Sequence, residues 1–275
     1  MLLALAAAAL SGSGDFLGGL AARQGRVMGV VLTNHMAGVV TVAALSPLFG
    51  GHLGGDTILW GSLAGVCGAG AVVALYTGFA RSTMGVVSPI AAVGAAAWPA
   101  LFEIAQGEIP GPVVIAGLLV GLVAIWTISG GGRIERTEAV RTGVLFGTLA
   151  GLGFGALLIF LSLGSDSSGI WALLPARLSG SLVVLVVVLG KGREFLRERG
   201  PVVASASAGV LAALGNGLFV LAAARGSLAV VSVLAAMFPV ATVLLAWVVL
   251  GERLTRQRRI GLVLALLAVG LVAGG

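Results

Sequence analysis

The chain divides into ten apolar stretches, and each has about the length that a helix needs to cross a lipid bilayer. A spanning helix needs about 20 mostly apolar residues. Charged residues and turn formers separate the stretches, which we place at 2–21, 27–49, 57–80, 84–104, 110–129, 141–163, 169–189, 202–224, 228–250 and 257–274. They are too long, and too rich in Ala, Leu and Gly, for barrel strands. The sequence therefore predicts an all-α integral membrane protein with ten transmembrane helices joined by short loops.

The composition excludes several other classes of protein. Hydrophobic residues make up 59% of the chain and charged residues 9%, whereas about 25% charged residues is usual in soluble domains. A soluble enzyme, a disordered chain and a nucleic-acid binder are excluded, and the lipid bilayer is the expected partner. The single cysteine, Cys67, excludes internal disulfides and multi-cysteine metal sites. No metal and no cofactor are expected. The first four residues lack the basic residues of a secretory signal, so we expect the first stretch to be retained.

Basic residues lie in alternate loops. The loops after the first, third, fifth, seventh and ninth stretches, together with the first residues of the stretches that follow them, contain all of the 16 Lys and Arg residues except Arg177 and Arg225. Because basic loops stay on the cytoplasmic side, this pattern predicts that these loops are cytoplasmic and that both termini lie outside.

The two halves of the chain resemble each other. A shift of 144 residues aligns the fourth and fifth stretches with the ninth and tenth without a gap. In this register Ala80-Arg81 matches Ala224-Arg225, and Gly107-Glu108 matches Gly251-Glu252. The two Gly-Glu pairs end equivalent helices, where we expect each Glu to cap its helix or to pair with loop basics such as Arg256.

Each half has five predicted spans, and an odd number forces the halves to cross the membrane in opposite senses. This gives an inverted repeat, with residues 1–131 and 141–275 as the two units and 132–140 as the linker. It also explains why Arg225, the equivalent of Arg81, lies on the other side. Inverted repeats are the architecture of many secondary transporters.

The same residues carry a family resemblance. The segment 84–89 leading to Gly107-Glu108, and Phe238-Pro239 leading to 251–254, resemble the paired EamA domains of the drug/metabolite transporter superfamily. Similarity to the bacterial ten-helix members lies in the segments 14–21, Trp171 and 175–177. The resemblance implies a multi-pass transporter of the bacterial inner membrane with a central cavity between its halves. It implies transport of small metabolites or amino acids, often outward. Many relatives have cytoplasmic termini, unlike the orientation that the charges predict here.

Asp15 is the only carboxylate well inside a span. An acid in the hydrocarbon region costs about 2.5–3.5 kcal/mol on insertion scales, so such residues usually have a function. Its neighbours one turn away, Ser11, Gly12, Gly18 and Gly19, form a small-residue face that suits the bundle interior. Asp15 is either a proton carrier or countercharge for an amine, or an acid near the interface that bonds a neighbour.

Arg177 lies inside the seventh stretch, and His35 occupies the equivalent position in the first half. A buried Arg needs an anion, which is either a side chain such as Asp15 or a substrate carboxylate. An acid together with a base would suit a zwitterion. His35 is either a hydrogen-bonded helix contact or a proton relay.

Other polar or amphipathic side chains at depth are candidates for lining the cavity or for plain packing; they are Asn34, Tyr76, Trp98, Trp171 and Asn216. Three prolines within spans remove backbone hydrogen bonds and bend helices. These hinge candidates are Pro89, Pro99 and Pro239. A glycine at every fourth position of the sixth stretch predicts the close approach of a neighbouring helix; these are Gly143, Gly147, Gly151 and Gly155.

These observations predict a secondary transporter that moves a small organic metabolite, amino-acid-like or an amine, by alternating access. Export or exchange is expected, with Asp15 as the candidate for coupling to protons, in a monomer or homodimer. An intramembrane enzyme would need converging nucleophiles, bases or metal ligands, and the chain has two histidines and one cysteine. A passive channel or scaffold is the third alternative. No Walker A motif for ATP is present.

Overall fold

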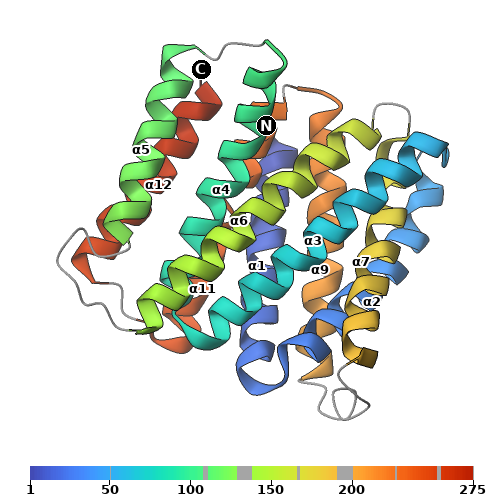
Figure 1. Cartoon of the computed structure of the whole chain (residues 1–275), viewed down its shortest axis with the longest axis horizontal. Helices are drawn as coiled ribbons and strands as arrows, with labels where there is room; N and C mark the ends of the chain where they lie inside the picture. Colours follow the sequence, from blue (N-terminus) through green and yellow to red (C-terminus); the bar gives the residue numbers. More distant parts are fainter. Residues whose placement is uncertain are drawn as a thin grey trace.

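The chain folds into a bundle of helices (Figure 1). The computed structural model describes residues 1–49, 51–107, 111–128, 138–165, 168–190, 201–226, 228–252 and 255–274, and it has no strand in these ranges. The helices are α1 (Leu2–Gln24), α2 (Val27–Leu45), η1 (Ser46–Leu48), α3 (Gly55–Arg81), α4 (Met84–Ala105), α5 (Pro112–Ile128), α6 (Glu138–Ser165), η2 (Gly169–Ala172), α7 (Leu173–Gly190), α9 (Val202–Ala223), α10 (Leu228–Ala235), α11 (Phe238–Leu250) and α12 (Arg256–Gly274). The predicted all-α fold is confirmed for the described residues.

Seven of the described helices are long and apolar enough to cross a bilayer: α1, α2, α3, α4, α6, α7 and α9. Their ends lie within four residues of the predicted stretches when η1 and η2 are counted with α2 and α7. The protein is therefore a multi-pass membrane protein. Most of the predicted linker at 132–140, and Glu108, lie outside the described residues.

The ninth predicted stretch is two helices instead of one. The helix α10 ends at Ala235 and α11 begins at Phe238, with Pro239 in its first turn. Proline lacks a backbone N–H and favours the first turn of a helix over its interior. Pro239 therefore follows a break in the helix, whereas Pro89 and Pro99 lie inside α4, which runs unbroken from Met84 to Ala105.

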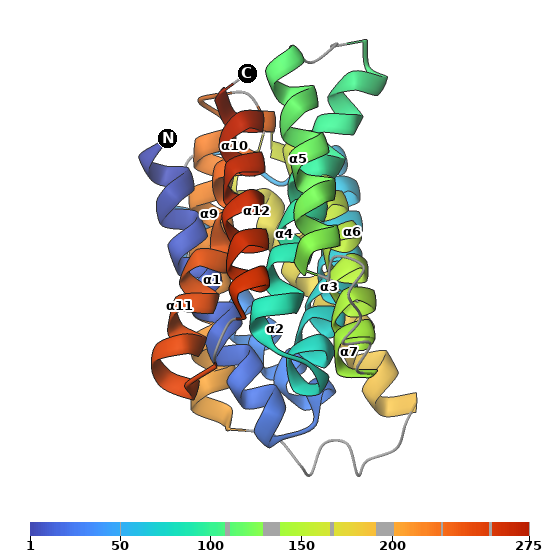
Figure 2. The same ribbon diagram turned by 90° about the vertical axis from the view of Figure 1, so that its left-hand side faces the viewer.

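The helices pack in neighbouring pairs. The helix α5 packs on α12 at one edge of the bundle, and α2 packs on α7 at the other (Figure 1). Between these edges α3 packs on α6 and α1 packs on α9. The helix α1 begins, and α12 ends, at the same end of the bundle (Figure 2).

The glycine stripe of α6 brings this helix against α4. Gly147 lies under the Val87 carbonyl, Gly151 faces Gly94, and Gly155 lies under Trp98. A Cβ added at Gly151 would come within 3.0 Å of α4 backbone atoms. The predicted close approach of a neighbouring helix is confirmed, and it removes lipid from between α4 and α6.

Candidate functional site

A cavity lies in the centre of the bundle, between helices of both halves of the chain. Residues of α1, α2, α3, α4, α6, α7, α9, α10 and α11 line it. Its apolar wall includes Phe154, Leu157, Leu161 and Phe219. Six of the predicted site residues line the same cavity: Asp15, Asn34, His35, Tyr76, Arg177 and Asn216. The fold thus gathers polar groups from α1, α2, α3, α7 and α9 around one space.

Asp15 reaches this cavity from the small-residue face of α1. Gly12 packs against the Phe238 carbonyl, Gly14 against the Ala208 carbonyl, and Gly18 against the ring of Tyr76. Asp15 itself is buried, and no described residue forms an ion pair or hydrogen bond with it. A buried carboxylate is costly unless it is paired, so its partner must come from the cavity: water, a proton or a cationic group.

Arg177 enters the cavity from α7 with an unsatisfied guanidinium. Its side chain passes over Gly38 of α2, and it is 7% exposed. The Nη2 atom is buried and no described group accepts a hydrogen bond from it. No Asp15–Arg177 ion pair is present among the described contacts. The cavity therefore holds an acid and a base without described partners. The salt bridge between Asp15 and Arg177, which was one of the alternatives from the sequence, is not present among the described contacts.

His35 is a hydrogen-bonded helix contact that also lines the cavity. Its Nδ1 lies 3.0 Å from the carbonyl of Val31. Because a carbonyl only accepts, Nδ1 is the donor in this bond. The ring packs against Gly180 of α7, one turn of helix after Arg177. His35 thus helps to hold α2 against α7.

Asn34 and Tyr76 form a buried pair at the cavity wall. The Asn34 amide Nδ2 donates to the Tyr76 hydroxyl across 3.1 Å, and each residue is 1% exposed. Gly18 leaves room for the tyrosine ring, which stacks on Phe79 with ring centres 6.4 Å apart. The pair therefore joins α2 to α3 at a fixed position.

Two predicted candidates do not line the cavity. Trp98 is 42% exposed, and its ring lies over Gly155 on the outer side of the α4–α6 contact. Trp171 lies in η2, beside Gly51, with a buried indole nitrogen that has no described partner. Size and amphipathic character selected both residues from the sequence, but helix rotation decides which side chains face inward. Ser11, one turn before Asp15, also lines the cavity, and helical spacing alone would have found it.

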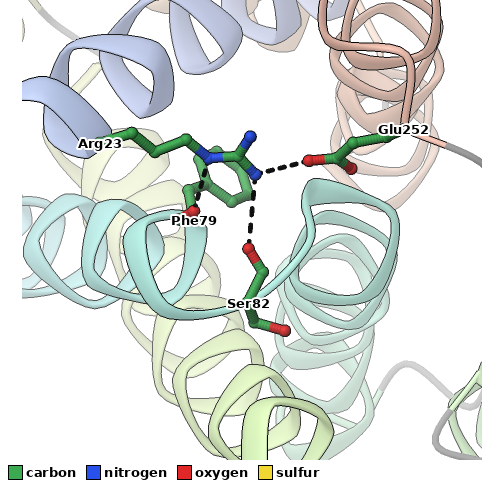
Figure 3. A network of polar contacts seen from close by, with 4 residues as sticks. All are labelled: Arg23, Phe79, Ser82 and Glu252. Carbon is green, nitrogen blue, oxygen red and sulfur yellow. Dashed lines mark hydrogen bonds and ion pairs between the residues drawn. The ribbon is translucent and has the colours of Figure 1, made fainter.

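A second polar cluster lies at one end of the bundle (Figure 3). Arg23, at the end of α1, donates from Nε to the Phe79 carbonyl at 2.9 Å and from Nη2 to the Ser82 carbonyl at 3.4 Å. The same Nη2 lies 2.5 Å from Oε1 of Glu252, which follows α11. We call these four residues the Arg23–Glu252 latch. The sequence had indicated that Glu252 caps its helix or pairs with a loop residue such as Arg256. In the structure Glu252 pairs instead with Arg23 of the first half.

The cavity and the latch lie at different depths in the bundle. Many of the cavity residues come from Ala7 to Asp15 of α1, from the last part of α6 and from the beginning of α7. These parts lie toward the end where α1 begins, at the top of Figure 2. The latch joins the opposite ends of α1 and α3. The polar cavity thus extends from the centre of the bundle toward the end opposite the latch.

Apolar helices, close helix packing and a polar central cavity define the chain as a multi-pass helical membrane protein. Residues 141–274 match the model of the EamA-like transporter family. This match covers the second half of the chain and is consistent with the drug/metabolite transporter superfamily that the sequence resembles.

The fold also has a counterpart among solved structures. One, described only as "Crystal structure of protein", has a TM-score of 0.62 and 16% sequence identity, over 96% of this chain and 95% of that chain. At this identity the likeness shows the fold alone. No curated protein matches the sequence significantly.

Proposed function

We propose that this chain is a secondary transporter which moves a small organic solute, amino-acid-like or an amine, by alternating access. The observation that carries the proposal is the central cavity between helices of both halves. Asp15 and Arg177 both line this cavity, and they form no described ion pair with each other. In this proposal ten spans cross the cell membrane of a bacterium as two inverted five-helix repeats, residues 1–131 and 141–275.

Reciprocal contacts between α2 and α7 support the inverted repeat. His35 of α2 packs against Gly180 of α7, and Arg177 of α7 packs against Gly38 of α2. His35 and Arg177 are 142 residues apart, and so are Gly38 and Gly180. A two-fold axis between equivalent helices produces this exchange of partners.

The neighbours of other helices repeat in the same way. The helix α3 packs on α6 as α1 packs on α9, and α3 packs on α7 as α2 packs on α9. In the proposed repeat α1, α2 and α3 are equivalent to α6, α7 and α9. Exchanging equivalent helices converts the α3–α6 contact into the α9–α1 contact, and the α3–α7 contact into the α9–α2 contact. The start of the family match at residue 141 further supports a unit that begins there.

The break between α10 and α11 supports a solute site in the membrane. Ala235, Ala236 and Phe238, which surround the break, line the cavity. Irregular backbone at membrane depth is tolerated where it lines a cavity or is buried in protein, and transporters often form their sites from discontinuous helices. We therefore assign α10 and α11 together to the ninth span.

The latch supplies the closed end that alternating access requires. It joins α1 and α3 of the first half to Glu252 of the second half. It lies at the basic end of the bundle, which the charge pattern predicts to be cytoplasmic. Opening the cavity toward that end requires that these bonds break, while closure at the opposite end traps the solute.

Transport in liposomes tests the proposal. Purified protein is reconstituted, and uptake is measured for separate pools of labelled amino acids, primary amines and carboxylates, with and without an imposed pH gradient. Saturable uptake of an amine or amino acid is expected. Flux that stays linear with concentration would show a channel, and no flux from any pool would overturn the proposal.

Asp15→Asn tests the coupling role of the acid. The amide keeps the size of the side chain but carries neither a negative charge nor a titratable proton. We expect gradient-driven uptake to fall to the level measured without a gradient, while the protein still elutes as a folded species. Unchanged uptake with unchanged pH dependence would remove Asp15 from the mechanism.

A further inference from the structure

Asn34 has an amide oxygen that nothing in the described structure satisfies. Its Nδ2 bonds the Tyr76 hydroxyl, but its Oδ1 is fully buried and without a partner. Asn34 lines the cavity. A buried acceptor that has lost water and gained no partner costs free energy, which a ligand N–H recovers by bonding it.

In the structure the NH₂ end of the Asn34 amide makes the bond to Tyr76, which leaves the oxygen end over. An asparagine side chain has one accepting and one donating end, and the two exchange when it rotates. With Nδ2 held by the hydroxyl, Oδ1 is the remaining group. Tyr76 is itself held by the close packing of Gly18 and by its stack on Phe79.

The backbone at Asn34 is fixed as well. Its carbonyl lies against Gly209 of α9, where a Cβ would collide with it. The side chain thus projects from a helix that packs directly on α9, toward a tyrosine ring that packs directly on α1. The orientation of the amide is built into the packing of α1, α2, α3 and α9.

Asp15 favours a cationic donor beside Asn34, while Arg177 in the same cavity suits a carboxylate of an amino-acid-like solute. Asp15 lines the same space without a described hydrogen-bond or ion-pair partner. A carboxylate and a neutral acceptor together suit a primary ammonium group, which has three donors and no acceptor.

We propose that Asn34 is the residue that selects a solute bearing an ammonium group, and that Tyr76 is the positioning residue which keeps the Asn34 Oδ1 facing that group. This rests on the proposed transport function and extends it. Asn34 contacts the solute, and Tyr76 acts through Asn34. Without the hydroxyl, the Asn34 NH₂ loses the acceptor that it bonds in the structure, so it is free to turn toward the ammonium group, and two donors do not bond.

The test compares each amine that is transported with its deaminated analogue, in liposomes, for four proteins: the wild type, Tyr76→Phe, Asn34→Asp and the double variant. Tyr76→Phe is expected to raise the KM for the amine about tenfold, the equivalent of one hydrogen bond to a charged donor. The KM for the analogue and the kcat for the amine should change little.

The double variant separates positioning from general packing. Aspartate presents oxygen at both ends of its side chain, so it needs no hydroxyl to orient it. Tyr76→Phe should therefore leave the preference for the amine unchanged in the Asn34→Asp background. If the loss is the same in both backgrounds, or applies equally to amine and analogue, Tyr76 is only a packing residue and the inference is wrong.

Failure of the proposed function has a different signature. Absence of saturable flux for every pool in the wild type overturns transport itself. Saturable flux of deaminated solutes, with no preference for an ammonium group, leaves transport standing and overturns the role of Asn34. Elution volume and thermal unfolding in detergent confirm that each variant is folded before its KM is compared.

Discussion

At the scale of single residues, glycine determines how closely the helices around the cavity approach. Gly209 allows α9 to touch the Asn34 carbonyl, and Gly215 of the same helix touches Ser11 of α1. A side chain at either position would meet backbone or a fixed neighbour. These contacts hold the polar residues of α1 and α2 in place. Their contribution can be measured as the loss of stability when a glycine is replaced by alanine.

Gly209→Ala should lower the stability of the protein. Its Cβ would collide with the backbone of Asn34, and forced overpacking costs about 1–3 kcal/mol. We expect a lower thermal unfolding midpoint in detergent. Gly217→Ala is the matched control, because it lies in the same helix with no atom within 4 Å of its added Cβ. That variant should be neutral or gain about 0.5–1 kcal/mol. Equal midpoints for the two variants would contradict the packing argument.

Sequence alone identifies Asp15 and Arg177 as candidate site residues, but it does not show whether the two form an ion pair. Asp15 and Arg177 stand out because charge in an apolar stretch is rare. Whether they pair depends on the rotation and depth of α1 and α7, which hydrophobicity does not encode. The same limit explains Trp98, whose amphipathic ring is typical both of a cavity wall and of the outer surface where it lies.

At the scale of the helices, sequence predicted lengths well and connections poorly. The length of an apolar stretch is fixed by the thickness of the bilayer, so the ends of helices such as α3 and α9 were predictable. The break between α10 and α11 was not predictable, because a proline in an apolar stretch is compatible both with a kink inside one helix and with the start of a new helix. The latch was also missed, since Arg23 and Glu252 are 229 residues apart.

Glu252→Gln should loosen the latch and favour opening at its end of the bundle. The amide removes the charge that pairs with Arg23, while the bonds from Arg23 to the Phe79 and Ser82 carbonyls remain. Opening is measured with Ser11→Cys in a Cys67→Ser background, as the rate of reaction with an impermeant thiol reagent. We expect faster reaction from the latch side.

Glu138→Gln is the control for this experiment. It removes an exposed carboxylate in the first turn of α6 that takes no part in the latch. Its reaction rate should equal that of the parent from both sides. If Glu252→Gln also reacts like the parent, the latch does not control access to the cavity.

At the scale of the whole molecule, the described bundle has one end where α1 and α3 finish with Arg23 and Arg81 and α12 begins with Arg256, and an opposite end where α1 begins and α12 ends (Figure 2). The positive-inside rule then predicts both termini outside. Fusing a reporter that is active only outside the cytoplasm to the C-terminus should give activity. Activity of a cytoplasmic reporter at that position would reverse the orientation and place the latch on the outer side.

The central claim is that one cavity serves both sides of the membrane in turn. Counterflow in liposomes tests it directly: the vesicles are loaded with unlabelled solute, and entry of the same labelled solute is followed. A carrier returns faster when occupied, so we predict that internal solute accelerates labelled entry and that the rate saturates. Labelled entry that is linear in concentration and indifferent to internal solute would contradict alternating access.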